Sequence, residues 1–115
     1  MTAPEPRRGD IWSYLPTVAG RDKPSALGAD RVLVLSTSTA NALLPTVFAL
    51  SVVPDAPRMP ALAVVLSTDD PLPEWSVVIY QAKTVYRPWL VERIGTVSEA
   101  TLRSVFAVTV GYLDR

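Results

Sequence analysis

Eleven prolines divide the 115-residue chain into short apolar runs and limit how long any single helix or strand can be. Proline cannot donate a backbone hydrogen bond, so it disrupts helix interiors and central strands. Hydrophobic residues nevertheless make up 49% of the chain, and its mean hydropathy is +0.24, which is enough for a packed core. The sequence therefore predicts one small domain built from many short elements, and it excludes a wholly disordered chain.

The chain contains neither His nor Cys, which limits the catalytic and metal-binding chemistry that its side chains can perform. It thus lacks the commonest general acid–base, the commonest metal ligand and any thiolate or disulfide. Acidic and basic residues balance at 11 each, and nine of the 11 basic residues are Arg. Two interpretations stay open: a local Arg-lined phosphate site, or the codon usage of a GC-rich genome.

The sequence indicates no membrane association. No stretch approaches the about 20 apolar residues that a transmembrane helix needs. The N-terminal residues 1–8 carry charges without an apolar run behind them, unlike a signal peptide. We therefore expect a cytoplasmic protein with no membrane partner.

Short β-branched runs predict five strands, at residues 10–15, 31–35, 46–53, 61–66 and 75–81, the last continuing over 84–86 after a bend. The third and fourth are expected to form a hairpin with a Pro-rich tip, and residues 36–44 hold a helical turn. Ser98 can cap a C-terminal helix. Its apolar stripe comprises Leu102, Val105, Phe106, Thr109, Val110 and Leu113.

These elements predict a mainly β (α+β) fold. Residues 1–7 form a flexible tail, and residues 8–115 form a single domain. Short links between successive strands favour a small curved antiparallel sheet, or a partly open barrel of about five strands, closed by the C-terminal helix. One such core is thin at this size, so we expect a homodimer that buries Trp12, Trp75 and Trp89.

Four motifs, in order, resemble the MazF/PemK toxin family. They are Arg8-Gly-Asp-Ile-Trp12, Val32-Leu-Val-Leu-Ser36, Pro45-Thr-Val-Phe-Ala-Leu50 and the block from Gln81 to Ser98. The resemblance implies an SH3-like sheet in a homodimer that acts as a sequence-selective endoribonuclease. It further implies cleavage of single-stranded RNA without a metal or other cofactor, and a cognate antitoxin that neutralises the toxin.

Three alternatives remain. One is a catalytically weakened member of this fold that binds RNA or antitoxin. Another is a gyrase poison of the CcdB type, which shares the fold. Such poisons use a Trp near the end of the C-terminal helix, and the segment Gly111-Tyr-Leu-Asp-Arg115 lacks it. The third is a structural or regulatory barrel with no nucleic-acid role.

Metal-free RNA cleavage needs a proton acceptor for the attacking ribose 2′-hydroxyl, a proton donor for the leaving 5′-oxygen, and a cation on the phosphorane. The resemblance makes Arg31 the candidate catalytic cation once a one-residue gap is allowed, whereas a gapless alignment puts Asp30 in its place. A shift of one residue turns a strand side chain to the opposite face. The alternative role of Arg31 is an ion pair with Asp30.

The family's second catalytic residue is a Thr or Ser at the end of the third strand, where this chain has Val53. Ser51, two residues earlier on the same face, is the candidate hydroxyl. Five further residues are candidate RNA contacts: Arg21, Lys23, Arg58, Tyr80 and Lys83. They come from the loop over residues 20–30, the Pro-rich tip and the motif that begins at Gln81. Their alternative roles are solvated charges and, for Tyr80, packing.

Overall fold

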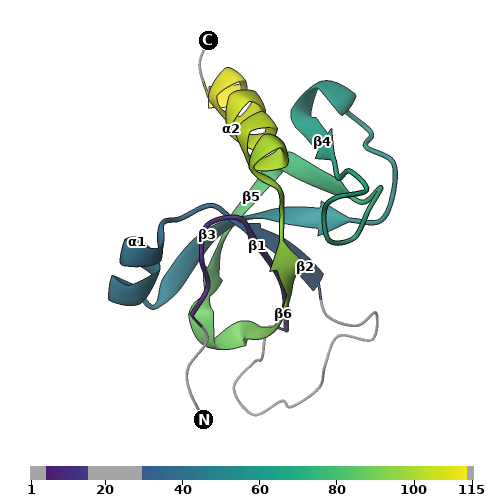
Figure 1. Cartoon of the computed structure of the whole chain (residues 1–115). Coiled ribbons are helices and arrows are strands. Elements are labelled where there is room, and N and C mark those ends of the chain that lie inside the picture. Colours follow the sequence, from purple (N-terminus) through teal and green to yellow (C-terminus); the bar gives the residue numbers. More distant parts are fainter. Residues whose placement is uncertain (1–4, 16–29, 114–115) are drawn as a thin grey trace.

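The computed structural model describes residues 5–15 and 30–113, which form a six-stranded antiparallel sheet with two α-helices (Figure 1). In chain order the elements are β1 (Asp10–Tyr14), β2 (Asp30–Val34), α1 (Ser38–Leu43), β3 (Thr46–Val53), the 3-10 turn η1 (Pro60–Leu62), β4 (Ala63–Val65), β5 (Ser76–Tyr86), η2 (Arg87–Trp89), β6 (Leu90–Thr96) and α2 (Glu99–Leu113). The strand order is β4-β5-β3-β2-β1-β6. This confirms the predicted mainly β, antiparallel fold with a C-terminal helix.

The sheet has one strand more than the sequence pattern predicts. Residues 90–96 form β6, which pairs with β1 and extends the sheet beyond the N-terminal strand. This strand is hard to recognise because only its first residue is buried, so its apolar and polar residues do not alternate cleanly. The expected continuation over residues 84–86 is part of β5, and the bend is a register shift opposite Leu50 and Ser51.

The predicted hairpin over residues 46–66 is wrong. Both β3 and β4 pair with β5, which therefore lies between them. A tight hairpin has a loop of two to five residues, whereas the stretch from Pro54 to Pro60 alone is longer and includes a third proline at Pro57. This stiff connection carries the chain past the place of the neighbouring strand, and β5 later fills that place.

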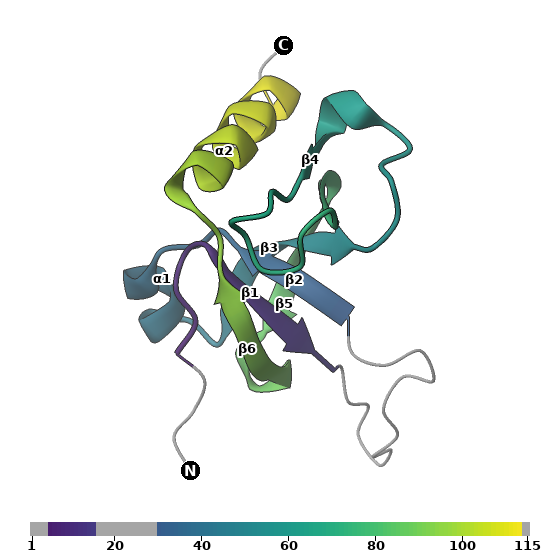
Figure 2. The same cartoon turned by 45° about the vertical axis from the view of Figure 1, so that its right-hand side comes forward.

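The two faces of the sheet support two separate apolar cores. The first core lies between the sheet and α2 and comprises Ile11, Leu33, Leu35, Leu50, Val52, Leu66, Val77, Ile79, Val97 and Val105. The second lies inside the curve of the sheet and comprises Trp12, Tyr14, Val32, Val34, Val47, Ala49, Val85 and Leu90. Figure 2 shows α2 on one side of the molecule, away from the curve formed by β1 and β6. Successive side chains of a strand point to opposite faces of the sheet, so the strand residues belong alternately to the first and the second core.

Helix α2 begins as predicted and ends differently. The Ser98 hydroxyl accepts a hydrogen bond from the Thr101 amide at 3.2 Å, which caps the helix. Val105 is fully buried, but the last members of the predicted stripe, Val110 and Leu113, are 58% and 75% exposed. The helix packs on the first core as far as Val108, and its last turn extends past the edge of the core.

Trp12 is buried in the second core of the single chain, so its burial needs no second copy. Trp75 and Trp89 are partly buried against the two cores. Neither helix among the described residues has the length and apolar character that crossing a membrane requires.

Candidate functional site

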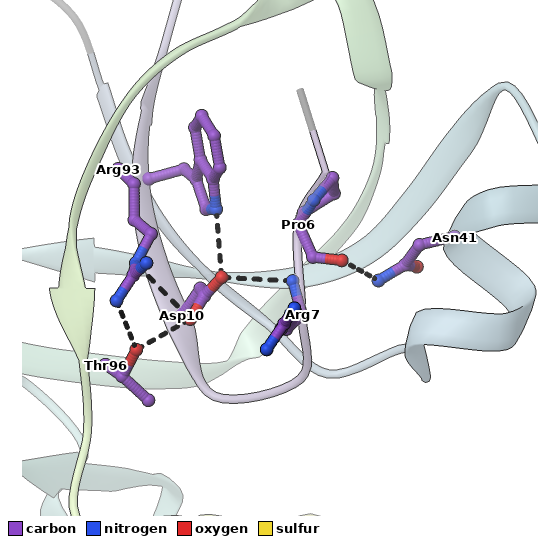
Figure 3. Close-up of polar contacts among 7 residues, drawn as sticks. Pro6, Arg7, Asp10, Asn41, Arg93 and Thr96 are labelled. Carbon is purple, nitrogen blue, oxygen red and sulfur yellow. Dashed lines mark hydrogen bonds and ion pairs between the residues drawn. The ribbon is translucent and has the colours of Figure 1, made fainter. Parts of the chain in front are cut away.

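Asp10, in the Arg8–Trp12 motif, has its polar contacts inside the fold (Figure 3). Its carboxylate is 3% exposed and accepts hydrogen bonds from the Arg7 amide at 3.0 Å and the Thr96 hydroxyl at 2.7 Å. The Trp12 indole N–H donates to it at 3.4 Å, and Arg93 Nε lies 3.8 Å from it. We call these five residues the Asp10 cluster. It joins the start of β1 to the end of β6.

The neighbouring residues of the motif also hold the chain together. Arg8 donates from Nε to the Leu35 carbonyl at 2.7 Å, and its guanidinium lies 5.0 Å from the centre of the Phe106 ring. Gly9 has a φ of +93°, a backbone conformation that side-chain-bearing residues rarely adopt. The motif is therefore structural: it positions the first strand against α2 and β6.

A second motif glycine is required by close packing. A Cβ atom added at Gly95 would lie 2.6 Å from Cγ of Pro71 and 3.2 Å from its Cβ. These distances are shorter than van der Waals contact, so any larger residue would push the loop before β5 away from β6. Pro71 therefore packs so closely against this position of the motif that glycine is the residue that fits there.

Asp70 organises the start of α2 from the same loop. Its carboxylate accepts hydrogen bonds from the Ser98 amide at 2.8 Å, the Thr101 hydroxyl at 2.6 Å, and the amide and hydroxyl of Ser67. Burial on its own raises the pKa of Asp70, but these hydrogen bonds outweigh it, and the pKa is below its ordinary value. The sequence pattern gave no sign of this role beyond the Pro-rich loop in which the residue lies.

The sheet register places Arg31 and Ser51 on opposite faces. Arg31 pairs with Val52 across β2 and β3, so it lies on the face of the first core. Ser51 pairs with Val32 on one side and Val78 on the other, so it lies on the face of the second core. The register therefore separates the two candidate catalytic residues, and the catalytic role of each remains a prediction.

Lys83 is the candidate cation on the face of Ser51. It pairs with Ala49 in β3, and its Nζ donates a hydrogen bond to the Tyr14 hydroxyl at 3.2 Å. The ammonium also lies 5.4 Å from the centre of the Tyr14 ring. Two strands separate β5 from β1 in the sheet, so this contact crosses the inside of the curve. No functional role was predicted for Tyr14. The sequence feature that could have indicated one is its position at the end of a strand, before a long loop.

Two further candidates, Arg58 and Tyr80, come together at a pocket of about 340 Å³. We call it the β3–β5 pocket, and it is lined by Val53, Asp55, Ala56, Pro57, Arg58, Met59, Ala63, Val78, Tyr80 and Gln81. Val78 is the cross-strand partner of Ser51, and Val53 lies two residues beyond Ser51 on β3. The pocket therefore adjoins the face that carries Ser51 and Lys83.

The pocket walls are fixed by the fold. Ser76 is fully buried, and its hydroxyl donates to the Asp55 carbonyl at 3.0 Å, which anchors the loop after β3. The turn η1 then joins this loop to β4, where Ala63 pairs with Val78. Arg58 is exposed at the loop tip, and Tyr80 is 37% exposed on β5.

Two candidate RNA contacts, Arg21 and Lys23, lie outside the described residues. Among residues 5–15 and 30–113, no three Asp or Glu side chains come close enough together to hold a metal ion. Of the described candidates, Ser51 and Lys83 thus lie on one face of the sheet, with Arg58 and Tyr80 at the adjoining pocket, and Arg31 lies on the other face.

No protein-family model matches this sequence, and no curated protein sequence matches it either. Its fold, however, is similar to solved structures. An endoribonuclease from a Mycobacterial species is 20% identical with a TM-score of 0.77, over 98% of this chain and 95% of that chain. A chain of the MazE–MazF crystal structure from Deinococcus radiodurans is 20% identical with a TM-score of 0.75, over 96% of both chains.

A MazF toxin of Mycobacterium tuberculosis is also similar. It is 17% identical with a TM-score of 0.71, and the similarity covers 91% of this chain and 96% of that one. These similarities extend over nearly the whole of each aligned chain. The chain therefore has the fold of the MazF endoribonuclease toxins, as its four motifs imply.

Proposed function

We propose that this chain is the toxin of a toxin–antitoxin pair and that it cleaves single-stranded RNA at selected sequences. The observation that carries the proposal is the full-length similarity to solved structures that are named as endoribonucleases, one of them in complex with its cognate antitoxin. The polar face formed by Ser51, Lys83 and the β3–β5 pocket adds groups suited to RNA. We propose that the protein acts in the cytoplasm, where its RNA substrate would be found.

The reaction begins when a ribose 2′-oxygen attacks the adjacent phosphorus. The new bond joins the 2′-oxygen to phosphorus, the bond to the 5′-oxygen breaks, and the products are a 2′,3′-cyclic phosphate and a 5′-hydroxyl. We assign the cation that stabilises the phosphorane to Lys83, because Lys83 shares a face with Ser51. Arg31 lies on the opposite face, so it can stabilise the phosphorane only if its side chain reaches the phosphate around the end of β2.

The proton steps belong to hydroxyl groups on the same face. Ser51 is 6% exposed and Tyr14 is 8% exposed, and the Tyr14 hydroxyl already accepts a hydrogen bond from Lys83. The attacking 2′-hydroxyl loses its proton to solvent water beside Ser51. The Tyr14 hydroxyl gives its proton to the leaving 5′-oxygen and regains one from Lys83, which is reprotonated from solvent. We propose that cleavage proceeds without a metal ion. The chain has no His or Cys, no three Asp or Glu side chains of the described residues lie close enough together to bind a metal, and the nucleophile is the RNA's own 2′-hydroxyl.

The partners that we propose are a second copy of the chain and a cognate antitoxin. The exposed apolar residues Val110, Tyr112 and Leu113 extend past the core at the end of α2 and favour association. Sedimentation equilibrium at micromolar concentration should give twice the 12.5 kDa chain mass. The monomer mass at that concentration would contradict the homodimer.

The deciding experiment incubates the purified chain with a defined single-stranded RNA, with EDTA or with Mg²⁺, and identifies the product ends by mass spectrometry. We expect equal cleavage in both conditions and 5′-hydroxyl ends at a small set of sequences. Cleavage that requires Mg²⁺ would refute the metal-free mechanism. A matched DNA strand, which lacks the 2′-hydroxyl, is the control and should stay intact.

A second candidate function is RNA or antitoxin binding with weakened catalysis. Two observations favour it: Val53 stands where the fold family carries a hydroxyl, and Arg31 faces away from Ser51. RNA binding without cleavage in the same experiment would establish this alternative.

A further inference from the structure

The β3–β5 pocket has the size and shape of a site for one small ligand. Its volume of about 340 Å³ lies at the lower end of the range, about 300–1,000 Å³, that small-molecule sites occupy. Its walls are already in place, because the Ser76–Asp55 hydrogen bond and the prolines of the loop fix its rim. A preformed pocket binds its ligand without the entropic cost of ordering a loop.

The charges at the pocket favour an uncharged ligand over a phosphate. Asp55 and Arg58 are the only Asp, Glu, Lys or Arg among its lining residues, and their charges offset each other. A carboxylate in the wall repels a phosphate, whereas it accepts hydrogen bonds from the N–H groups of a base. Gln81, also in the wall, can both donate and accept such bonds.

The aromatic and apolar walls favour a flat ring. Tyr80 presents a partly exposed aromatic ring, and Met59 and Val53 add apolar surface. A nucleobase stacked on an aromatic side chain gains about 1–3 kcal/mol, whatever its sequence. Single-stranded RNA can offer such a base, because its unpaired bases can leave the stack and enter a pocket.

We propose that the β3–β5 pocket binds one unstacked nucleobase of the RNA, which stacks on Tyr80 and is read at its edge by Asp55 and Gln81. This inference rests on the proposed RNA substrate and adds a base-specificity site to it. The phosphates on either side of the base then lie outside the pocket, toward Arg58 at the rim and Lys83 on the neighbouring face.

The test measures binding to RNA that cannot be cleaved. The probes are fluorescent 2′-O-methyl octanucleotides of A, C, G or U, and an octamer of the same backbone without bases. Fluorescence anisotropy gives the affinities of the parent, Tyr80→Ala and Tyr80→Phe. Tyr86→Ala is the matched control, because Tyr86 is also exposed and lies on β5 but does not line the pocket.

We expect at least one base-bearing octamer to bind about tenfold more tightly than the abasic octamer. Tyr80→Ala should remove this difference, whereas Tyr80→Phe and Tyr86→Ala should keep it. Equal binding of all five probes by the parent would overturn the proposal. Equal affinities for Tyr80→Ala and Tyr86→Ala would also overturn it. Retention of the difference by Tyr80→Phe excludes misfolding as the cause of a loss.

A separate cleavage assay distinguishes this inference from the proposed function. If the chain cuts RNA and Tyr80→Ala binds every octamer like the parent, the base site is wrong and the endoribonuclease stands. If the chain binds base-bearing octamers through Tyr80 but cuts no RNA, the base site stands and the endoribonuclease is wrong. If it binds none of the probes, the base site is overturned.

Discussion

The Asp10 cluster and the β3–β5 pocket both contain polar residues, but they use them in opposite ways. In the Asp10 cluster, donors from Arg7, Trp12 and Thr96 converge on one carboxylate that is 3% exposed. In the pocket, Tyr80 is 37% exposed, and Arg58 lies in the open at the rim. The hydrogen bonds of the Asp10 cluster stabilise the fold, whereas the polar groups of the β3–β5 pocket stay accessible to a ligand.

This difference shows why a motif cannot be assigned a role from its residues alone. Both regions include residues of motifs that resemble the MazF family, namely Asp10 and Trp12 in the first and Gln81 in the second, and both contain charged side chains. A buried carboxylate whose partners all belong to the chain contributes to stability. An exposed aromatic ring beside a preformed cavity contributes little to stability, which favours a role in binding. Changes in the two regions should therefore affect different measurements.

The largest effect on stability is expected for Asp10→Ala. It leaves several buried donors without an acceptor and should lower the free energy of unfolding by about 3 kcal/mol. Urea denaturation followed by circular dichroism measures it. Asp69→Ala, at an exposed position, is the control and should change the value by about 0.5 kcal/mol or less. Unchanged stability with lost RNA binding would move the Asp10 cluster to the functional site.

The largest effect on activity is expected for Lys83→Ala. Loss of the cation should lower the cleavage rate about a hundredfold, or about 2.7 kcal/mol of transition-state stabilisation. Arg31→Ala is the matched comparison from the opposite face and should stay within about twofold of the parent. Single-turnover rates on one RNA measure both. The reverse order of the two rates would return the catalytic role to Arg31.

Gly95→Ala tests whether the second motif glycine belongs with the structural region. The added methyl group collides with Pro71, so we expect a loss of about 2 kcal/mol of stability. Gly111→Ala, whose Cβ would meet no atom within 4 Å, should instead stabilise α2 by about 0.5–1 kcal/mol. Thermal unfolding of both variants measures the contrast. Equal effects would show that Pro71 moves aside.

Asp70 extends the comparison to acid conditions. Its pKa in the folded chain lies below the ordinary value of about 3.9, so its stabilising contribution is present above that value. The contribution is lost as the pH falls through the lower, folded pKa. Asp70→Asn should cost about 1 kcal/mol at neutral pH and weaken the acid dependence. Urea denaturation between pH 6 and about 2.5 measures it, and parallel curves for parent and variant would contradict it.

The smallest effect is expected for Val53→Thr, which adds a hydroxyl where the β3–β5 pocket meets the face of Ser51. We expect cleavage to rise severalfold with the free energy of unfolding nearly unchanged, because Val53 is only half-buried. The rate on the RNA used for Lys83→Ala measures it. A lower rate at full stability would show that apolar contact at this position matters more than the hydroxyl.

Several features of the fold follow from local sequence. The β-branched runs over residues 46–53 and 75–81 form strands because their side chains pack well on a pleated surface. The helix after Ser98 begins where a capping hydroxyl precedes an apolar repeat. What could not be predicted is which strands become neighbours. That choice depends on long-range pairing, such as β6 with β1, which local patterns do not encode.

In the candidate site, too, some features could be predicted from the sequence and others could not. Arg58 could be proposed as an RNA contact from the Pro-rich tip, and Tyr80 and Lys83 from the motif at Gln81 and the residue before it. The structure gathers the three near one face, and their roles remain predictions. The separation of Arg31 from Ser51 could not be decided from sequence, because it depends on a register of one residue. The hydrogen bond between Lys83 and Tyr14 joins strands that are distant in sequence, so no local signal revealed it.

The pairing of β1 with β6 also has a consequence for how the chain folds during synthesis. Asp10 and Thr96 lie 86 residues apart in sequence, and β1 has no partner on that edge until the β6 segment has left the ribosome. Contacts of such long sequence separation form slowly, because the loop between them must first be closed. The nascent chain therefore completes its sheet only after residue 96 has emerged, and a chain cut before residue 90 keeps an open edge that favours aggregation over activity.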